Sequence, residues 1–287
     1  MNNDYGNLEL HKVLLSAMKD IDKICRENNL NYFLHAGTLL GALNYKGFIP
    51  WDDDVDISLF RDDYEKLINI LIEKYSDIYF IENYKTQPYF SHNRTVLRVL
   101  GTEMIHQQPD PNHNEIGIDI IPLDSTPRTK IQQFIQQKKI KFLDLLVQIN
   151  LKNIIPNSLK LKFFVKFISI FFNLNRTKLG FLIDKECTKY NRKNNSTHVG
   201  LLSYVDINPY TGKSGYENDL MLREWYENPI YVAFEDTEFM TISAPEKDLI
   251  HRYGPDWNKP YPEEKRIRKH GATGYIISDE VRKRLEI

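Results

Sequence analysis

The stretch "HAGTLLGALNYKGFIPWDDDVDISLF", residues 35–60, places four aspartates within five positions, directly before an alternating apolar run. Clustered carboxylates repel one another, and their burial is costly unless a positive charge lies nearby. The alternation in "DVDISLF" is the period-two pattern of a β-strand. Asp54 and Asp56 are therefore predicted to project from one face of that strand, where their carboxylates can converge on one or two divalent cations.

A further acid lies in a second apolar stretch, "GIDIIP", where Asp119 is flanked by Ile118 and Ile120. A carboxylate in the middle of an apolar strand is costly unless it is neutralised. Hard oxygen ligands suit Mg²⁺ or Mn²⁺, which bind a few carboxylates together with substrate phosphates. The pattern therefore predicts a metal site formed by Asp54, Asp56 and Asp119 on neighbouring strands.

The aspartate run has two other interpretations. A solvated acidic turn is the ordinary role of such a run, and this interpretation stays open. A calcium loop of the EF-hand type is excluded, because that loop needs Gly where this chain has Ile57 and Glu where it has Asp63.

The run "AGTLLG" before the aspartates fits a phosphate site. Gly37 allows the backbone to approach a phosphate closely, and Thr38 is predicted to cap a short helix whose amides face an anion. A strand, a Gly-Thr turn and an Asp-x-Asp pair that begins 17 residues after Gly37 resemble the layout of the nucleotidyltransferase superfamily. In that superfamily, strand carboxylates hold metal against the phosphates of a nucleotide.

The rest of the chain alternates helices and strands before it becomes helical. Apolar periodicity predicts helices at 7–28 and 62–75 and strands at 31–38, 93–105 and 114–124. We expect an α+β fold, with a nucleotidyltransferase-like mixed β-sheet core, flanking helices and a basic helical insertion. The expected parts are a catalytic core at 1–127, a basic helical segment at 128–196, and a C-terminal part at 197–287 that completes the same catalytic unit.

Composition sets the broad class. The chain has 287 residues, 27% of them charged, with a net charge of -1 and two cysteines, Cys25 and Cys187. The cysteines have neither metal-type spacing nor a disulfide pattern, which is typical of a reducing, cytoplasmic compartment. The N-terminal residues lack the basic and apolar regions of a signal peptide, and no apolar stretch reaches the roughly 18 residues that span a bilayer.

Positive charge is concentrated in one part of the chain. Residues 128–193 contain fifteen Lys or Arg and three acids, a net charge of +12, so the remainder of the chain carries -13. Within this part, residues 158–178 combine phenylalanines with lysines. They predict either a core-packed helix with a solvated basic face or an interfacial helix on the inner face of an anionic membrane. No nucleic-acid-binding module accompanies the charge, so nucleic acid is not an expected partner.

The acidic stretch, together with "LRVLGTEMI", "IGIDIIPLD" and "YGPDWNKPYPEEKR", closely resembles the LicD family of phosphocholine transferases, which includes the fukutin-related proteins. The resemblance covers most of the chain outside the basic segment. It implies a transferase that takes a CDP-linked alcohol, moves its phospho-alcohol to a hydroxyl of a cell-surface or lipid-linked glycan, and releases CMP. CDP-choline is the expected donor, with CDP-ribitol and CDP-glycerol as alternatives, and lipopolysaccharide, teichoic acid or capsule is the expected acceptor.

The resemblance also assigns residues. Asp54 and Asp56 match the family's metal-binding pair, and Asp119 matches its third carboxylate, which is also expected to act near the acceptor hydroxyl. Asp52 matches a family aspartate and is expected to support the turn, whereas Asp53 is expected to be solvated. Arg98 and Lys46 are expected to neutralise phosphates. Relatives commonly carry Arg-His before Lys46, where this chain has Asn44-Tyr45, so one cationic contact is missing.

A quaternary ammonium prefers aromatic faces, so Trp51, Tyr45, Trp257 and Tyr261 are candidate walls of a choline site, with Trp51 first among them. Two other classes of function stay open. An ordinary nucleotidyltransferase would release pyrophosphate from a nucleoside triphosphate, and a non-catalytic binding protein would release nothing.

Overall fold

The computed structural model describes residues 5–87, 93–106, 113–150, 160, 163–164, 166–167, 175–193, 196–204, 208, 210–266 and 272–287. Packing divides the chain into two compact units. Unit 1 comprises residues 1–81, 95–121 and 224–287, and unit 2 comprises residues 82–94 and 122–223. The domain limits expected from the sequence, at residues 127 and 196, stay a prediction.

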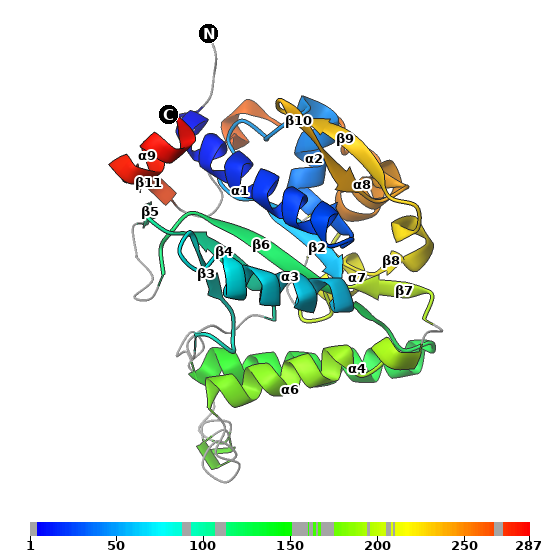
Figure 1. Cartoon of the computed structure of the whole chain (residues 1–287). Coiled ribbons are helices and arrows are strands. Elements are labelled where there is room, and N and C mark those ends of the chain that lie inside the picture. Colours follow the sequence, from blue (N-terminus) through cyan, green and yellow to red (C-terminus); the bar gives the residue numbers. More distant parts are fainter. Residues whose placement is uncertain are drawn as a thin grey trace. The chain divides into compact units, whose positions relative to one another are not determined.

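The central sheet of unit 1 has the strand order β1-β2-β6-β4-β3 (Figure 1). Its strands are β1 (Tyr32–Leu34), β2 (Asp56–Phe60), β3 (Tyr79–Glu82), β4 (Thr95–Val99) and β6 (Gly117–Ser125), of which β3 and β6 end in unit 2. Pairing is antiparallel between β1 and β2 and between β4 and β6. The two strands that carry Asp56 and Asp119 are neighbours in the middle of this order, and the predicted α+β fold is confirmed.

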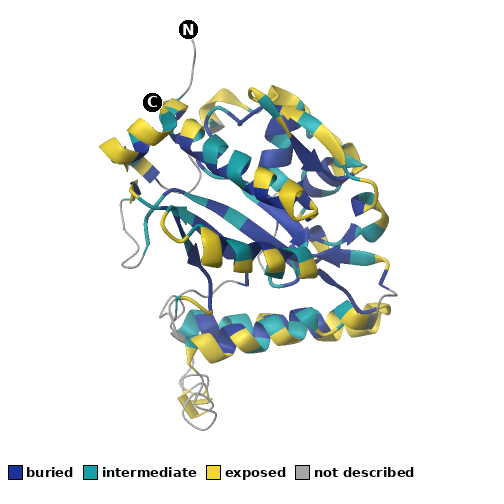
Figure 2. Ribbon diagram, in the orientation of Figure 1, coloured by how far each residue is buried: buried dark blue, intermediate teal, exposed yellow. Residues whose placement is uncertain are grey.

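The described residues of unit 1 form five α-helices: α1 (Leu8–Glu27), α2 (Ala36–Tyr45), α3 (Arg61–Lys74), α8 (Pro245–Tyr253) and α9 (Asp279–Leu285). Helix α1 follows the three-and-four apolar spacing of its sequence, so Leu10, Leu14 and Ile21 have no solvent exposure. These side chains join those of β2 and β6 in one hydrophobic core. Figure 2 shows this core as dark blue strands and helix faces.

Besides the central sheet, the part of unit 1 that the structure describes contains two antiparallel strand pairs. They are β5 (Thr102–His106) with β11 (Ala272–Ile277), and β9 (Ile230–Phe234) with β10 (Thr237–Thr241). The single strand predicted at 93–105 is wrong, because the chain turns at Gly101, whose φ of 81° favours glycine. Strand β4 therefore ends before Gly101, and β5 begins after it.

Unit 2 contains the basic helices α4 (Lys130–Asn150) and α6 (Arg176–Thr188), which pack together around Ile140, Val147, Leu179 and Ile183. The unit also contains β7 (His198–Gly200), α7 (Gly215–Asn218) and β8 (Met221–Leu222), with β7 paired to the end of β6 and to β8. Short 3₁₀ turns lie at Asn191–Lys193 in unit 2, at Arg223–Tyr226, where unit 2 ends and unit 1 resumes, and at Glu263–Lys265 in unit 1.

Most of residues 158–178, the predicted interfacial helix, lies outside the described residues. Of its phenylalanines, Phe163, Phe164 and Phe167 are described, and they are 51–73% exposed. Within the described ranges, no helix has the length and apolar content that a membrane crossing requires.

Both cysteines are buried, free thiols, and Cys25 has no solvent exposure. Burial, with a smaller contribution from Asp22, raises the pKa of the Cys25 thiol to about 12. Since the thiolate is the reactive form, we expect no modification of Cys25 by a thiol reagent in the native protein at pH 7–8 and full modification in denaturant. Mass spectrometry after iodoacetamide treatment checks this, and rapid native labelling of Cys25 would contradict its burial.

Candidate functional site

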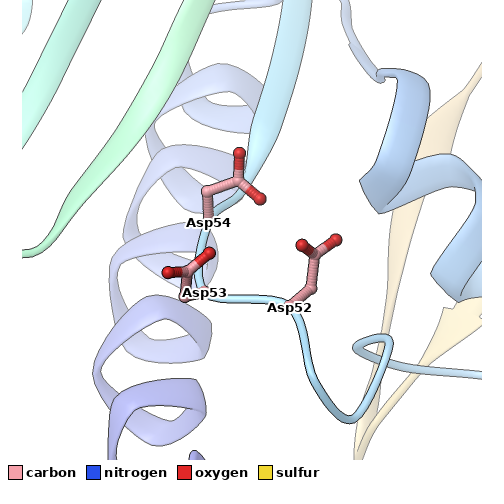
Figure 3. A group of neighbouring side chains, drawn as sticks. All are labelled: Asp52, Asp53 and Asp54. Atoms are coloured by element: carbon pink, nitrogen blue, oxygen red, sulfur yellow. The ribbon is translucent and has the colours of Figure 1, made fainter. Parts of the chain in front are cut away.

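The acidic run lies in the segment between α2 and β2, which is held in unit 1. One carboxylate oxygen from each of Asp52, Asp53 and Asp54 lies within 4.8 Å of the other two (Figure 3). Asp52 and Asp53 are 8% and 6% exposed. The expectation that Asp53 is solvated is therefore wrong: the chain buries this carboxylate beside Asp52 and Asp54 rather than turning it toward water.

The start of α1 fixes the position of this segment. Asn7, which caps α1 and has no solvent exposure, donates from Nδ2 to the carbonyl oxygens of Pro50 (3.2 Å) and Asp52 (3.1 Å). His11, one turn further along, has its Nε2 atom 2.9 Å from the same Asp52 carbonyl oxygen. Sequence reasoning missed Asn7 and His11, because nothing local connects them to residues more than 40 positions away.

Helix α2 contributes Gly37 and Thr38 on the other side of the acidic segment. A Cβ atom on Gly37 would lie 3.3 Å from Asp52 Oδ2, so the glycine leaves room beside that oxygen. Thr38 Oγ1 accepts the Asp56 amide at 2.8 Å. The prediction that Thr38 caps α2 is wrong: the helix begins at Ala36 with His35 in the cap position, and the Thr38 hydroxyl holds the start of β2 instead.

Asp56 and Asp119 meet through the central sheet. The sequence pattern predicted that Asp54 lies within the strand. Strand β2 begins at Asp56, however, so Asp54 precedes the strand. The Asp119 amide donates to the Val55 carbonyl at 2.8 Å, which places Asp119 beside the residue that separates Asp54 from Asp56. Val55, Ile118 and Ile120 are fully buried, whereas the three acids are half-buried. The alternation therefore brings all three acids to the same region of unit 1, and their role as metal ligands stays a prediction.

The two predicted phosphate-binding residues, Arg98 and Lys46, lie in different elements of unit 1. Arg98 on β4 pairs with Gly117, two positions from Asp119, and donates from Nη1 to the Glu115 carbonyl at 2.9 Å. Lys46 follows the last turn of α2 in the left-handed conformation, and its carbonyl oxygen accepts the Glu235 amide at 2.7 Å. The Lys46 side chain is exposed.

Aromatic side chains gather around Trp51, which immediately precedes the acidic run and is 5% exposed. The rings of Tyr5 and Tyr45 meet the Trp51 ring edge-on at 5.6 and 5.8 Å between centroids, and Tyr261 stacks on it at 6.0 Å. The Arg266 guanidinium lies 5.2 Å from the centroid of the same ring. Three of the four predicted aromatic residues are thus brought together, and a cation already occupies one position at Trp51.

Trp257, the fourth predicted aromatic residue, packs against the main core of unit 1. His35, which precedes the Gly-Thr pair, is buried. Burial and, secondarily, the positive charge of Arg252 hold the pKa of His35 well below its usual value, so its imidazole is neutral at pH 7. A neutral, buried imidazole fits the structural role expected for His35 from the sequence.

The residues present fit a hard divalent cation. Their donors are carboxylate oxygens, the ligand type that Mg²⁺ and Mn²⁺ prefer, and the glycine at position 37 leaves Asp52 Oδ2 uncrowded. Across the part of the chain that the structure describes, Asp52, Asp53 and Asp54 form the one group of three potential ligands gathered this closely. Asp54 belongs both to this group and to the predicted trio with Asp56 and Asp119.

Replacement by alanine is expected to affect stability differently at two glycines of α2. A Cβ on Gly41 would lie 2.5 Å from the Gly47 carbonyl oxygen, and backbone cannot move aside cheaply, so Gly41→Ala is expected to destabilise the fold by about 1–3 kcal/mol. Gly37→Ala meets only a side-chain oxygen, and the gain in helix propensity of about 1 kcal/mol offsets that contact. Urea denaturation checks both variants; a Gly41→Ala protein as stable as the wild type would contradict the close approach of α2 to residue 47.

Residues 29–154 match the LicD/FKTN/FKRP nucleotidyltransferase domain. The lipopolysaccharide cholinephosphotransferase LicD of Haemophilus influenzae is 24% identical over 278 residues, which cover 94% of this chain and 97% of the relative. Uncharacterised proteins of Rickettsia prowazekii and Rickettsia typhi are 43% and 44% identical over 58 and 50 residues, 20% and 17% of this chain and 22% and 16% of theirs.

The matched domain contains α2, the acidic segment, β2, β4 and β6, and hence every acid of the candidate site. The part of the chain that carries the candidate site therefore matches the LicD/FKTN/FKRP family domain, and nearly the whole chain is similar to a lipopolysaccharide cholinephosphotransferase.

Proposed function

We propose that this protein transfers phosphocholine from CDP-choline to a hydroxyl group of a cell-surface glycan and releases CMP. The observation that carries the proposal is the acidic segment beside β2 and β6, in a chain that aligns over nearly its whole length with a cholinephosphotransferase acting on lipopolysaccharide. Lipopolysaccharide, teichoic acid and capsule are the acceptor classes that the proposal includes.

The reaction is a phosphoryl transfer in which the protein supplies position and charge. The acceptor oxygen forms a bond to the phosphorus that carries choline, and the bond from that phosphorus to the bridging oxygen breaks. CMP leaves with the bonding electron pair. Asp119, half-buried on β6 beside Val55, is proposed to take the proton from the acceptor hydroxyl.

Asp54 and Asp56, with Asp119, are proposed to hold Mg²⁺ or Mn²⁺, and the clustered Asp52 and Asp53 add carboxylate charge beside Asp54. When bound, the cation would neutralise the pyrophosphate and the departing CMP. Gly37 and Thr38 at the start of α2, with the side chains of Lys46 and Arg98, are proposed to receive the donor's phosphates.

The choline group is proposed to bind at the rings around Trp51. The Arg266 guanidinium at 5.2 Å supports this placement, because it shows that the Trp51 ring accommodates a cation. Tyr45, which is 41% exposed, is the wall of the cluster most open to a ligand. Neither ribitol nor glycerol carries a positive charge, so this cluster favours CDP-choline over CDP-ribitol or CDP-glycerol.

A donor panel tests the proposal. The protein is incubated with Mg²⁺ and, separately, CDP-choline, CDP-ribitol, CDP-glycerol and CTP, while melting temperature, CMP and pyrophosphate are measured. The proposal expects CDP-choline to give the largest increase in melting temperature and the fastest CMP release. Preference for CDP-ribitol or CDP-glycerol would replace the donor but keep the reaction class. Pyrophosphate release from CTP would show a nucleotidyltransferase, and absence of any binding would favour a non-catalytic protein.

A further inference from the structure

Helix α4 of unit 2 has apolar residues on two faces. Its buried face, which includes Ile140 and Val147, packs against α6. A second apolar row, formed by Ile131, Phe134, Ile135 and Phe142, is 44–74% exposed. We call these four residues the α4 stripe. Their spacing of three, four and seven positions places them on one side of the helix, away from the buried face.

In the part of the chain that the structure describes, exposed phenylalanine occurs in unit 2 alone. Among the described residues, the phenylalanines classed as exposed are Phe134, Phe142, Phe163, Phe164, Phe167 and Phe181, all of them in unit 2. The described phenylalanines of unit 1 are buried or half-buried. An exposed set of large apolar side chains on an otherwise ordinary globular protein indicates an interaction surface.

Lysines border the α4 stripe. Lys138 lies within the row and places its Nζ 5.1 Å from the centroid of the Phe134 ring, while exposed Lys139 and Lys141 precede Phe142 by three positions and one position. Figure 2 shows exposed residues recurring along both α4 and α6. A helix with aromatic residues along one side and lysines at its borders is the type that lies in the interface of an anionic bilayer.

A pocket of about 490 Å³ adjoins the stripe between α4 and α6. It is lined by Lys139, Phe142, Leu143, Leu182, Lys185, Glu186 and Lys189. Glu186 lies 4.0 Å from Lys139 Nζ and 3.3 Å from Lys189 Nζ, so one carboxylate is shared by two of the three lysines. The lining therefore keeps a net positive charge around an apolar floor, which is complementary to an anionic headgroup joined to acyl chains.

We propose that the α4 stripe and the adjoining lysine-lined pocket bind an anionic phospholipid bilayer, with the stripe inserted at the headgroup level and Lys139, Lys185 and Lys189 on lipid phosphates. Charge complementarity selects this occupant, because unit 2 contains the whole of segment 128–193, whose net charge of +12 a neutral partner would leave uncompensated. The proposal concerns unit 2 alone and does not depend on the transfer reaction.

The test is flotation of the full chain, without donor or acceptor, with vesicles of phosphatidylglycerol and phosphatidylcholine and with vesicles of phosphatidylcholine alone. We expect binding to the anionic vesicles that weakens as salt rises. Phe134→Ser with Phe142→Ser, and separately Lys139→Gln with Lys185→Gln and Lys189→Gln, should each reduce the partition coefficient at least about tenfold. All these side chains are exposed, and circular dichroism verifies that each variant folds.

Matched controls are available in the same chain. Lys12, Lys74 and Lys247 are exposed lysines of unit 1, and their triple change to Gln removes equal charge at residues that belong to neither the α4 stripe nor the pocket. Ile72→Ser with Ile250→Ser removes two exposed apolar side chains of unit 1, neither of them part of the α4 stripe or the pocket. Both controls should bind within about twofold of the wild type. Equal binding to both vesicle types, loss of binding in the controls, or a stripe variant that only abolishes self-association in light scattering would overturn the proposal. Failure of the donor panel would leave this result unaffected.

Discussion

Replacement of Asp54 with Asn is expected to reduce CMP release from CDP-choline by about a thousandfold, because a lost metal ligand costs several kcal/mol of transition-state stabilisation. Asp54 is the residue shared by the clustered carboxylates at 52–54 and by the predicted trio with Asp56 and Asp119. Asn keeps the size of the side chain but removes its charge. Steady-state kinetics at saturating Mg²⁺ and donor measure the effect.

The same variant has a distinctive stability signature. Without metal, Asp54→Asn should melt no lower than the wild type, because repulsion from Asp52 and Asp53 is relieved. The rise in melting temperature that Mn²⁺ gives the wild type should be lost. Asp62→Asn, at an exposed acid on α3, is the matched control and should keep both turnover and the metal response. An Asp54→Asn enzyme that retained more than about a tenth of wild-type turnover would show that metal catalysis at this residue is wrong.

Parallel Asn variants of the other acids resolve which of them bind the cation. If the trio holds it, Asp56→Asn and Asp119→Asn should lose the Mn²⁺ response as completely as Asp54→Asn, and Asp53→Asn should lose less. Loss confined to Asp52, Asp53 and Asp54 would assign the ion to the clustered segment instead.

Asn7→Ala is expected to have the second largest effect, although Asn7 lies far from the acids in sequence. The change removes two hydrogen bonds and leaves the buried carbonyl oxygens of Pro50 and Asp52 with one donor fewer each, which should cost about 1–3 kcal/mol of unfolding free energy. Turnover should also fall about tenfold or more, since small displacements of catalytic groups have large effects on rate. Urea denaturation and kinetics of the folded variant measure the two effects.

Asn28→Ala is the matched control for Asn7→Ala. Asn28 ends the same helix, is exposed, and its amide bonds only the local Ile24 carbonyl at 2.8 Å. We expect this control to lose less than about 1 kcal/mol and no turnover. A folded Asn7→Ala protein with wild-type turnover would contradict the role of α1 in positioning the acidic segment.

Features that depend on local pattern could be predicted from the sequence. The spacing of apolar residues predicts α1 correctly, and the alternation around Asp119 predicts the buried faces of β6. The aspartate run marks the site because that much negative charge beside a core strand needs a physical reason. Strands β2 and β6 are neighbours in the central sheet, and they bring Asp56 and Asp119 to one region.

Features that depend on contacts between distant residues could not be predicted. The hydrogen bond from Asn7 to the Asp52 carbonyl joins residues 45 positions apart, and the stacking of Tyr261 on Trp51 joins residues 210 positions apart. No local periodicity in the sequence indicates either contact. The Thr38 hydroxyl satisfies a cap preference in the sequence but holds Asp56 in the fold, because the helix begins two residues earlier. Asp53 is buried for a similar reason, since the shape of the segment follows from the packing of α1 and α2.

The most direct test of the proposed reaction is the position of oxygen transfer. With CDP-choline and Mg²⁺ in H₂¹⁸O and no glycan, water takes the place of the acceptor, and mass spectrometry locates the label in the two products. Attack at the choline-bearing phosphorus places ¹⁸O in phosphocholine and leaves CMP unlabelled, which is the expected result. Label in CMP would place the attack at the other phosphorus and contradict phosphocholine transfer.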